Sequence, residues 1–126
     1  MNTLLLTAAG LAFLVGLVHS VLGEVLIFRR MRQGGLIPTK GGRVIEERHV
    51  RIVWASWHVL TVFGWCLAAV LLRLAGTQSA RNAGLANTVA AAMLAGSALV
   101  LVATKGKHPG WIGLLAVATL ARLSNY

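Results

Sequence analysis

Apolar residues along this chain fall into four stretches that are separated by short polar or glycine-rich segments. The first stretch, residues 3–28, is longer than the roughly 20 residues that a helix needs to cross the hydrocarbon core of a bilayer. We predict helices at about 3–29, 43–74, 82–104 and 109–123, with a loop at about 30–42. The pattern therefore predicts an all-α fold: an integral membrane four-helix bundle of antiparallel up-down topology, in a single transmembrane domain over residues 1–126.

Helix breakers set the boundaries of these helices. Glycine and proline residues follow the first basic cluster, at Gly34, Gly35, Pro38, Gly41 and Gly42. They end the first helix and permit a turn, whereas the stretch after them lacks breakers, so we expect the second helix to begin near Arg43. Pro109 suits the first turn of the last helix, where its missing N–H costs nothing. This last helix is short for a membrane span.

Small residues recur at every fourth position of the third helix, at Gly84, Thr88, Ala92 and Gly96. Such spacing lets helix backbones approach closely in a membrane, where packing must replace the hydrophobic drive for association. We therefore predict that this face packs against another helix. The third helix is expected to be scaffold, because it has no ionisable residue between Arg81 and Lys105.

The composition favours a membrane protein and excludes several other classes. The 126 residues are 57% hydrophobic and 12% charged, with a mean hydropathy of +0.76, which is too apolar for an ordinary soluble domain. The net charge of +9 does not predict a nucleic-acid partner, because the basic residues sit at the ends of apolar runs. The single cysteine, Cys66, excludes an internal disulfide and a cysteine-based metal motif, and we expect a free, buried thiol.

Basic residues are distributed unequally between the two ends of the predicted bundle. The end that holds the long loop and the turn near residue 106 carries nine of them: Arg29, Arg30, Arg32, Lys40, Arg43, Arg48, Arg51, Lys105 and Lys107. The opposite end carries three: Arg73, Arg81 and Arg122. Because basic loops stay in the cytoplasm, we expect both termini on the non-cytoplasmic side of a bacterial cytoplasmic (inner) membrane.

Ionisable residues cluster in the cytoplasmic half of this arrangement, which holds all four histidines and all three carboxylates. Glu24 and His19 interrupt the first apolar helix, and His58 interrupts the second. With a rise of about 1.5 Å per residue, Glu24 lies about 7 Å, His58 about 10 Å and His19 about 15 Å below the cytoplasmic interface. Since ionisable side chains are costly inside a membrane, these three are candidates for a functional site.

Helical periodicity turns these residues toward the interior of the bundle. His19 and Glu24 flank a face of small residues on the first helix and lie about 140° apart at 100° per residue. One stripe of the second helix carries its strong polar and aromatic groups: Glu47, Arg51, Trp54, His58, Thr61 and Trp65. His108 heads the last helix at the same end.

Imidazole and carboxylate groups from different helices are the usual ligands of Zn, Fe, Mn or Cu in helical bundles. The sequence thus predicts a site for a divalent transition metal or, failing that, for proton exchange. Its expected ligands are His19, Glu24, His58 and His108. Residues expected to support them by hydrogen bonds or ion pairs are Glu47, Arg51, Ser20 and Trp54. The sequence contains neither a known metal motif of the His-Glu-x-x-His type nor a catalytic serine or cysteine arrangement.

Structural interpretations of the same residues remain open. Glu24 can pair with Arg29 or Arg51 and fix the hairpin of the first two helices. A membrane histidine can hydrogen-bond serine or threonine on a neighbouring helix. The spacing of Glu47 and Arg51 favours an exposed i,i+4 ion pair. Tryptophans near the cytoplasmic end fit an aromatic belt at the interface.

Four functions are compatible with this pattern. The first is a metal-binding membrane protein, with oxidoreductase or hydrolase activity as an option, and the second is a non-catalytic accessory or assembly subunit of a larger membrane complex. The third is a proton-coupled small transporter that uses Glu24, and the fourth is a b-type haem protein with His19 and His58 as axial ligands. Haem is disfavoured because adjacent helices lie only about 8–10 Å apart. The expected partners are the lipid bilayer and either a larger complex or a homo-oligomer.

Overall fold

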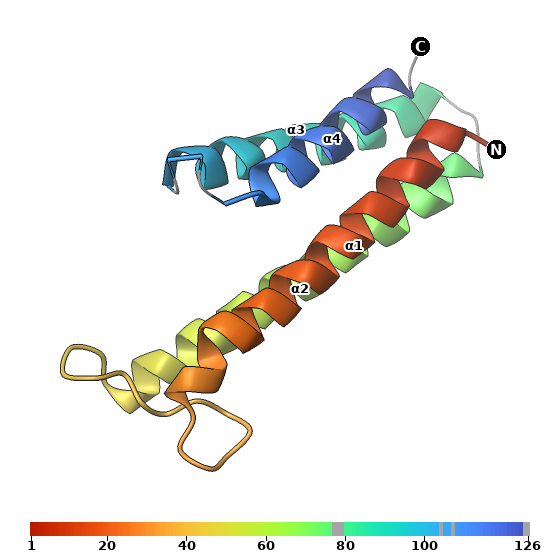
Figure 1. The fold of residues 1–126 in the computed structure, drawn as a ribbon. Coiled ribbons are helices and arrows are strands. Elements are labelled where there is room, and N and C mark those ends of the chain that lie inside the picture. The colour runs from red at the N-terminus through yellow and green to blue at the C-terminus, as the bar shows by residue number, and fades with distance from the viewer. Residues whose placement is uncertain (77–79, 104, 107, 125–126) are drawn as a thin grey trace. The chain divides into compact units, whose positions relative to one another are not determined.

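The structure of the protein is a computed structural model that describes residues 1–76, 80–103, 105–106 and 108–124. These residues form four α-helices and one short 3₁₀ helix, and no strand occurs among them (Figure 1). The helices are α1 (Thr3–Leu26), α2 (Glu47–Ala75), α3 (Ala80–Ala103) and α4 (Gly110–Leu123), and the 3₁₀ helix is η1 (Phe28–Met31). The all-α prediction is confirmed.

Three of these elements are long and apolar enough to cross a membrane, namely Thr3–Met31, Glu47–Ala75 and Ala83–Val102. The remaining apolar helix, Gly110–Leu123, has 14 residues. At about 1.5 Å per residue, 14 residues cover about 21 Å, which is less than the roughly 30 Å of a hydrocarbon core. The expectation of three long apolar helices and one short one therefore agrees with the structure.

The segment between α1 and α2 departs from the expected boundaries. After Leu26 the chain tightens into η1, which ends at Met31, and the next residue, Arg32, is extended with φ −86° and ψ 145°. Gly34 and Gly42 adopt φ values of +94° and +72°, which only glycine accepts without strain. Because these turns occupy the chain, α2 begins at Glu47 and not near Arg43. Glu47 then lies in the first turn, where a carboxylate stabilises the helix dipole.

The chain divides into two compact units. Unit 1 comprises residues 1–15 and 64–126, and unit 2 comprises residues 16–63. Unit 1 contains the hydrophobic core, built from residues of all four helices. Its largest members are Leu5, Leu71, Leu74, Met93 and Val117, and alanines such as Ala8, Ala86 and Ala121 fill the positions between them. Alanine permits helix backbones to approach closely because its side chain is a single methyl group.

Polar contacts at the N-terminus tie unit 1 together. The Asn2 side-chain oxygen accepts hydrogen bonds from the backbone N–H groups of Leu4 and Leu5, at 3.1 Å each, and so caps α1. Its amide nitrogen donates to the backbone oxygen of Ser124 at 2.9 Å, and its own backbone N–H donates to Ala75 at 2.7 Å. Asn2 thus provides a hydrogen-bond acceptor for N–H groups in the first turn of α1 and joins α1 to the ends of α2 and α4.

Of the small-residue face predicted on α3, the Gly96 end packs against another helix within unit 1: Gly96 is half-buried, and a Cβ there would lie 3.6 Å from the Leu114 side chain of α4. Gly84, Thr88 and Ala92 are exposed, and a Cβ added at Gly84 would meet no atom within 4 Å. The buried face of α3 is instead the one that carries Val89, Met93 and the hydroxyl of Ser97. That hydroxyl donates to the backbone oxygen of Trp111 at 2.7 Å and links α3 to α4. The prediction therefore holds at Gly96 and not at the other three positions, because the core face of α3 is the one that carries Ala86, Val89, Ala90 and Met93.

Cys66 is a free cysteine, as expected, but it is exposed and not buried. It occupies the side of α2 that faces away from the buried positions Ala68 and Leu71 of unit 1.

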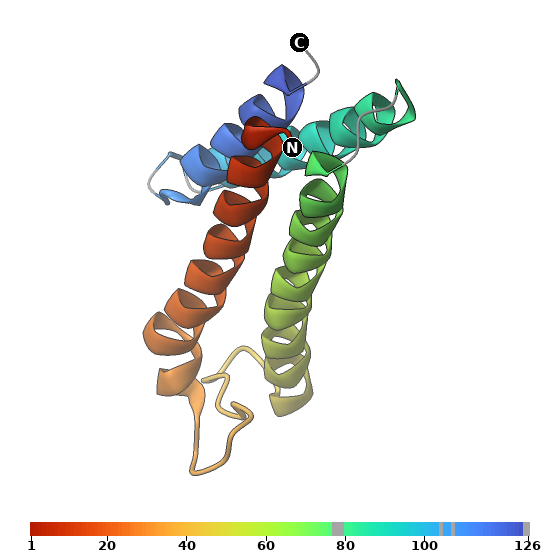
Figure 2. The ribbon, with the colours of Figure 1, turned by 90° about the vertical axis from the view of Figure 1, so that its right-hand side faces the viewer.

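Unit 2 contains the second half of α1, η1, the following loop and the first half of α2, and Figure 2 shows these two helical halves beside each other. Phe28 and Val50 are fully buried at its loop end, together with Pro38. The backbone oxygen of Met31 accepts hydrogen bonds from the N–H groups of Thr39 and Lys40, at 3.0 and 2.9 Å. These bonds close residues 31–40 into a compact loop.

Candidate functional site

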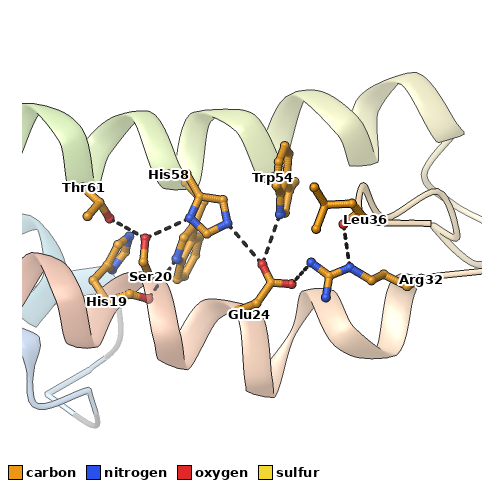
Figure 3. Close-up of polar contacts among 9 residues, drawn as sticks. His19, Ser20, Glu24, Arg32, Leu36, Trp54, His58 and Thr61 are labelled. Carbon is orange, nitrogen blue, oxygen red and sulfur yellow. Dashed lines mark hydrogen bonds and ion pairs between the residues drawn. The ribbon is translucent and has the colours of Figure 1, made fainter. Parts of the chain in front are cut away.

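A row of hydrogen-bonded side chains connects α1 with α2 inside unit 2 (Figure 3). The Thr61 and Ser20 hydroxyl oxygens lie 2.9 Å apart, and the Ser20 oxygen lies 2.8 Å from Nδ1 of His58. On the other side of the imidazole ring, Nε2 lies 3.3 Å from Oε2 of Glu24. The row therefore runs from Thr61 through Ser20 and His58 to Glu24, with contributions from the two helices in alternation.

The positions of these residues along the two helices explain the row. On α2, His58 and Thr61 are three residues apart and therefore lie on one face of the helix. On α1, Ser20 and Glu24 are four residues apart and therefore also share one face. Thr61 is buried, while Ser20, His58 and Glu24 are half-buried. The polar groups are thus held between the helices, where side-chain hydrogen bonds are needed to offset the loss of water.

The chemistry of each group fixes the direction of these hydrogen bonds. When Glu24 is ionised its oxygen can only accept, so a neutral His58 donates from Nε2 and accepts from the Ser20 hydroxyl at Nδ1. Ser20 in turn accepts from Thr61. When His58 is protonated, both ring nitrogens donate, and the Ser20 and Thr61 hydroxyls reverse their direction. The same atoms therefore satisfy both charge states of His58 without a change of partner.

Glu24 has two further partners. Nε1 of Trp54 donates to Oε2 at 3.2 Å, and the guanidinium of Arg32 forms an ion pair with Oε1. Arg32 also donates from Nε to the backbone oxygen of Leu36 at 2.6 Å. The expected ion pair of Glu24 with Arg29 or Arg51 is therefore wrong. The reason is the tight turn of η1 and the extended backbone at Arg32, which return this side chain toward α1.

His19 lies beside the row but makes different contacts. Its ring stacks on the indole of Trp57 with a centroid distance of 4.4 Å and an angle of 7° between the planes. Nε1 of Trp57 donates to the backbone oxygen of His19 at 3.1 Å, and Phe28 packs edge-on against the same indole at 5.7 Å. A Cβ at Gly23 would overlap the indole. Gly23 therefore allows Trp57 to lie against α1.

The other predicted site residues lie apart from this row. Glu47 and Arg51 form the exposed i,i+4 ion pair that their spacing favours, at 2.6 Å. His108 belongs to unit 1, where its Nδ1 accepts a hydrogen bond from the backbone N–H of Gly110 at 3.1 Å. Across the described residues, no group of three or more His, Cys, Asp or Glu side chains gathers in a way that could hold a metal ion. Of the four expected ligands, Glu24 and His58 are adjacent through their side-chain atoms.

Sequence reasoning overlooked Arg32, the role of Thr61 and the contact of Trp57 with His19. Thr61 could have been found, because it lies three residues from His58 on the polar stripe of α2. The role of Arg32 could not have been found, because the direction of its side chain depends on the conformation of η1, which no periodic pattern in the sequence predicts. Comparisons with models of protein families, with characterised proteins and with solved structures find no match to this chain.

Proposed function

We propose that the protein is an integral membrane protein that moves protons along the Thr61–Ser20–His58–Glu24 row, as the coupling element of a small transporter. The observation that carries this proposal is the placement of His58, whose two ring nitrogens contact a hydroxyl on one side and a carboxylate on the other. Histidine exchanges protons near neutral pH, and the hydroxyls can pass a proton by reversing their hydrogen bonds. Ionisable chains of this kind serve as proton relays in membrane transporters.

The surface of the helices supports a membrane location. Large apolar side chains such as Leu60, Phe63 and Leu99 are exposed by 61%, 62% and 71%. Extended exposed apolar surface of this kind fits contact with lipid or with other membrane proteins. We infer that the lipid bilayer covers most of it. A larger membrane complex or a second copy of the chain remains a proposed partner for the rest.

We further propose an antiparallel bundle with both termini outside the cytoplasm. The order of contacts in unit 2 supports opposite helix directions, because Ser20 contacts Thr61 whereas Glu24, later in α1, contacts the earlier residue Trp54. The excess of basic residues near the 30–42 loop supports a cytoplasmic loop in an inner membrane. Alkaline phosphatase fused after Tyr126 is then expected to be active. An inactive fusion, together with a loop accessible from outside, would invert this topology.

Proton flux through reconstituted protein tests the proposed relay. Liposomes that contain the full chain and a trapped pH-sensitive dye are exposed to a pH step, and the rate of internal acidification is recorded. The wild type is expected to exceed protein-free liposomes, and His58→Ala and Glu24→Gln are expected to fall to the level of the protein-free leak. Ser20→Ala should also slow the flux, because it removes the hydroxyl that contacts Nδ1.

Matched controls are available in the same unit. His49→Ala and Glu46→Gln remove an exposed histidine and an exposed carboxylate that lie outside the row, and both should keep the wild-type flux. Wild-type flux equal to the protein-free leak would contradict the proposal. Equal flux in His58→Ala and His49→Ala would contradict it as well.

Binding of a divalent transition metal is a second candidate, and the adjacent Glu24 and His58 side chains are the observation in its favour. Metal analysis of gently purified protein checks it, since a stoichiometric metal that is lost in His58→Ala would support it. Binding should then weaken on acidification, because a ligand imidazole must be neutral. The haem hypothesis is weaker, because both nitrogens of His58 already have partners and the His19 ring stacks on Trp57.

A further inference from the structure

We propose that the segment joining α1 to α2, residues 28–45, binds anionic phospholipid headgroups at the surface of the membrane. This interaction is separate from the proton relay and does not depend on it. The argument rests on uncompensated positive charge, on exposed apolar side chains between the charges, and on a hollow in the compact loop.

Most of the positive charges of this segment have no carboxylate side chain as a partner among the residues that the structure describes. All three glutamates of the chain are already paired with other residues: Glu24 with Arg32, Glu46 with Arg48 and Glu47 with Arg51. Four exposed basic residues form no ion pair with a glutamate in the described part of the chain, namely Arg29, Arg30, Lys40 and Arg43. They lie within 15 residues of sequence, from 29 to 43. Such a density of positive charge fits an anionic surface.

Apolar side chains are exposed between these charges. Leu36 is 77% exposed and Val44 is 92% exposed, while Ile37 and Ile45 are exposed by 37% and 43%. Exposing such side chains to water costs about 25 cal/mol per Å² of apolar surface, whereas the interfacial region of a bilayer accepts them. The combination of basic and apolar side chains therefore favours a lipid surface over nucleic acid, which offers charge without an apolar layer.

The loop itself offers a preformed concave surface. Its ends are closed by the two hydrogen bonds to the backbone oxygen of Met31, and Pro38 is fully buried beneath it. An open hollow of about 420 Å³ lies in this region, lined by Gln33, Gly35, Leu36, Ile37, Thr39 and Arg51. The Gln33 amide and the Thr39 hydroxyl can donate to a phosphodiester beside two aliphatic side chains that suit acyl carbons, while the Arg51 guanidinium in this hollow is already paired with Glu47.

Lipid binding by the full chain in neutral detergent tests this proposal. The protein is titrated with phosphatidylglycerol or with phosphatidylcholine of the same acyl chains, and bound lipid is counted by native mass spectrometry. Phosphatidylglycerol is expected to bind more tightly. The Arg29→Gln/Arg30→Gln variant should lose this preference, by roughly fivefold in affinity for each charge removed. Added salt should weaken the preference, since exposed charges are screened.

The control variant is Arg73→Gln/Arg122→Gln, which removes the same charge outside the segment and should keep the preference. A second variant, Leu36→Ser/Ile37→Ser, should weaken binding of both lipids, and circular dichroism confirms that each variant stays helical. Equal binding of the two lipids, or an unchanged preference in Arg29→Gln/Arg30→Gln, overturns the proposal. Displacement of the lipid by inorganic phosphate would indicate a free-anion site instead. A lipid-independent dimer lost in Leu36→Ser/Ile37→Ser would make a second copy the occupant.

Discussion

The substitution Gly23→Ala tests whether the close approach of α2 to α1 holds unit 2 together. A Cβ at this position would overlap Nε1 and the neighbouring ring carbons of Trp57, so the indole must move. Movement would disturb the 3.1 Å hydrogen bond to His19 and the stacking of the two rings at 4.4 Å. Overpacking of this kind costs about 1–3 kcal/mol, and alanine regains about 1 kcal/mol of helix propensity. We expect a net destabilisation of up to about 2 kcal/mol, and therefore a stability about 1–3 kcal/mol below that of a variant that gains the helix propensity without the overlap.

Gly10→Ala is the matched control, because a Cβ added at Gly10 meets no atom within 4 Å on the same helix. This variant should be as stable as the wild type or slightly more so. Stability is measured by equilibrium unfolding in mixed detergent, followed by tryptophan fluorescence. In a Trp57→Leu background the penalty of Gly23→Ala should shrink, which gives a coupling energy of about 1 kcal/mol in a double-mutant cycle. Equal stability of Gly23→Ala and Gly10→Ala would refute the close packing of Gly23 against Trp57.

Two further predictions concern unit 1. Asn2→Ala removes the cap of α1 and the hydrogen bond to Ser124, and should lower the unfolding free energy by about 1 kcal/mol in the same unfolding assay. Asn2→Asp keeps an oxygen acceptor for the cap and should lower the unfolding free energy by less. Ser97→Ala removes the buried link to Trp111 and should cost about 0.6–1.7 kcal/mol. Thr88→Ala removes an exposed hydroxyl that donates to Gly84 of the same helix, and it should leave stability unchanged. A loss of stability equal to that of Ser97→Ala would contradict the assigned buried face of α3.

The helical fold was accessible from the sequence because length and apolarity alone produce long helices. The polar stripe of α2 was accessible for a similar reason, since His58 and Thr61 share one face whatever surrounds them. Their partners on α1 then followed from the small and polar residues at Ser20 and Glu24. Periodicity therefore indicated the faces of α1 and α2 that carry these four side chains, but not which side chains bond, since His19, an expected ligand, stacks on Trp57 instead.

Two features were not accessible, and both depend on conformation outside regular helix. Arg32 reaches Glu24 because η1 tightens the chain and Arg32 itself is extended, and neither property is periodic in sequence. The packed face of α3 was mispredicted because small-residue spacing permits a close crossing but does not require one. Val89 and Met93 lie on the core face of α3, and Gly84, Thr88 and Ala92 are left exposed.

Charge balance explains how an apolar helix pair can hold the candidate site. Arg32 offsets the negative charge of Glu24 through the ion pair, so this carboxylate does not need a charged His58. A neutral His58 still fills both of its hydrogen-bonding positions, with Ser20 on one side and Glu24 on the other. Addition of a proton then changes the charge of the group by one without breaking a contact, because only the hydroxyl directions reverse. The Arg32–Glu24 pair lies on the α1 side of the hairpin, so the bonds of Ser20 with Thr61 and His58, and of Glu24 with His58 and Trp54, are the ones that join α1 to α2. In the proposed relay, the bonds of Ser20 with Thr61 and His58 would also give a proton its path.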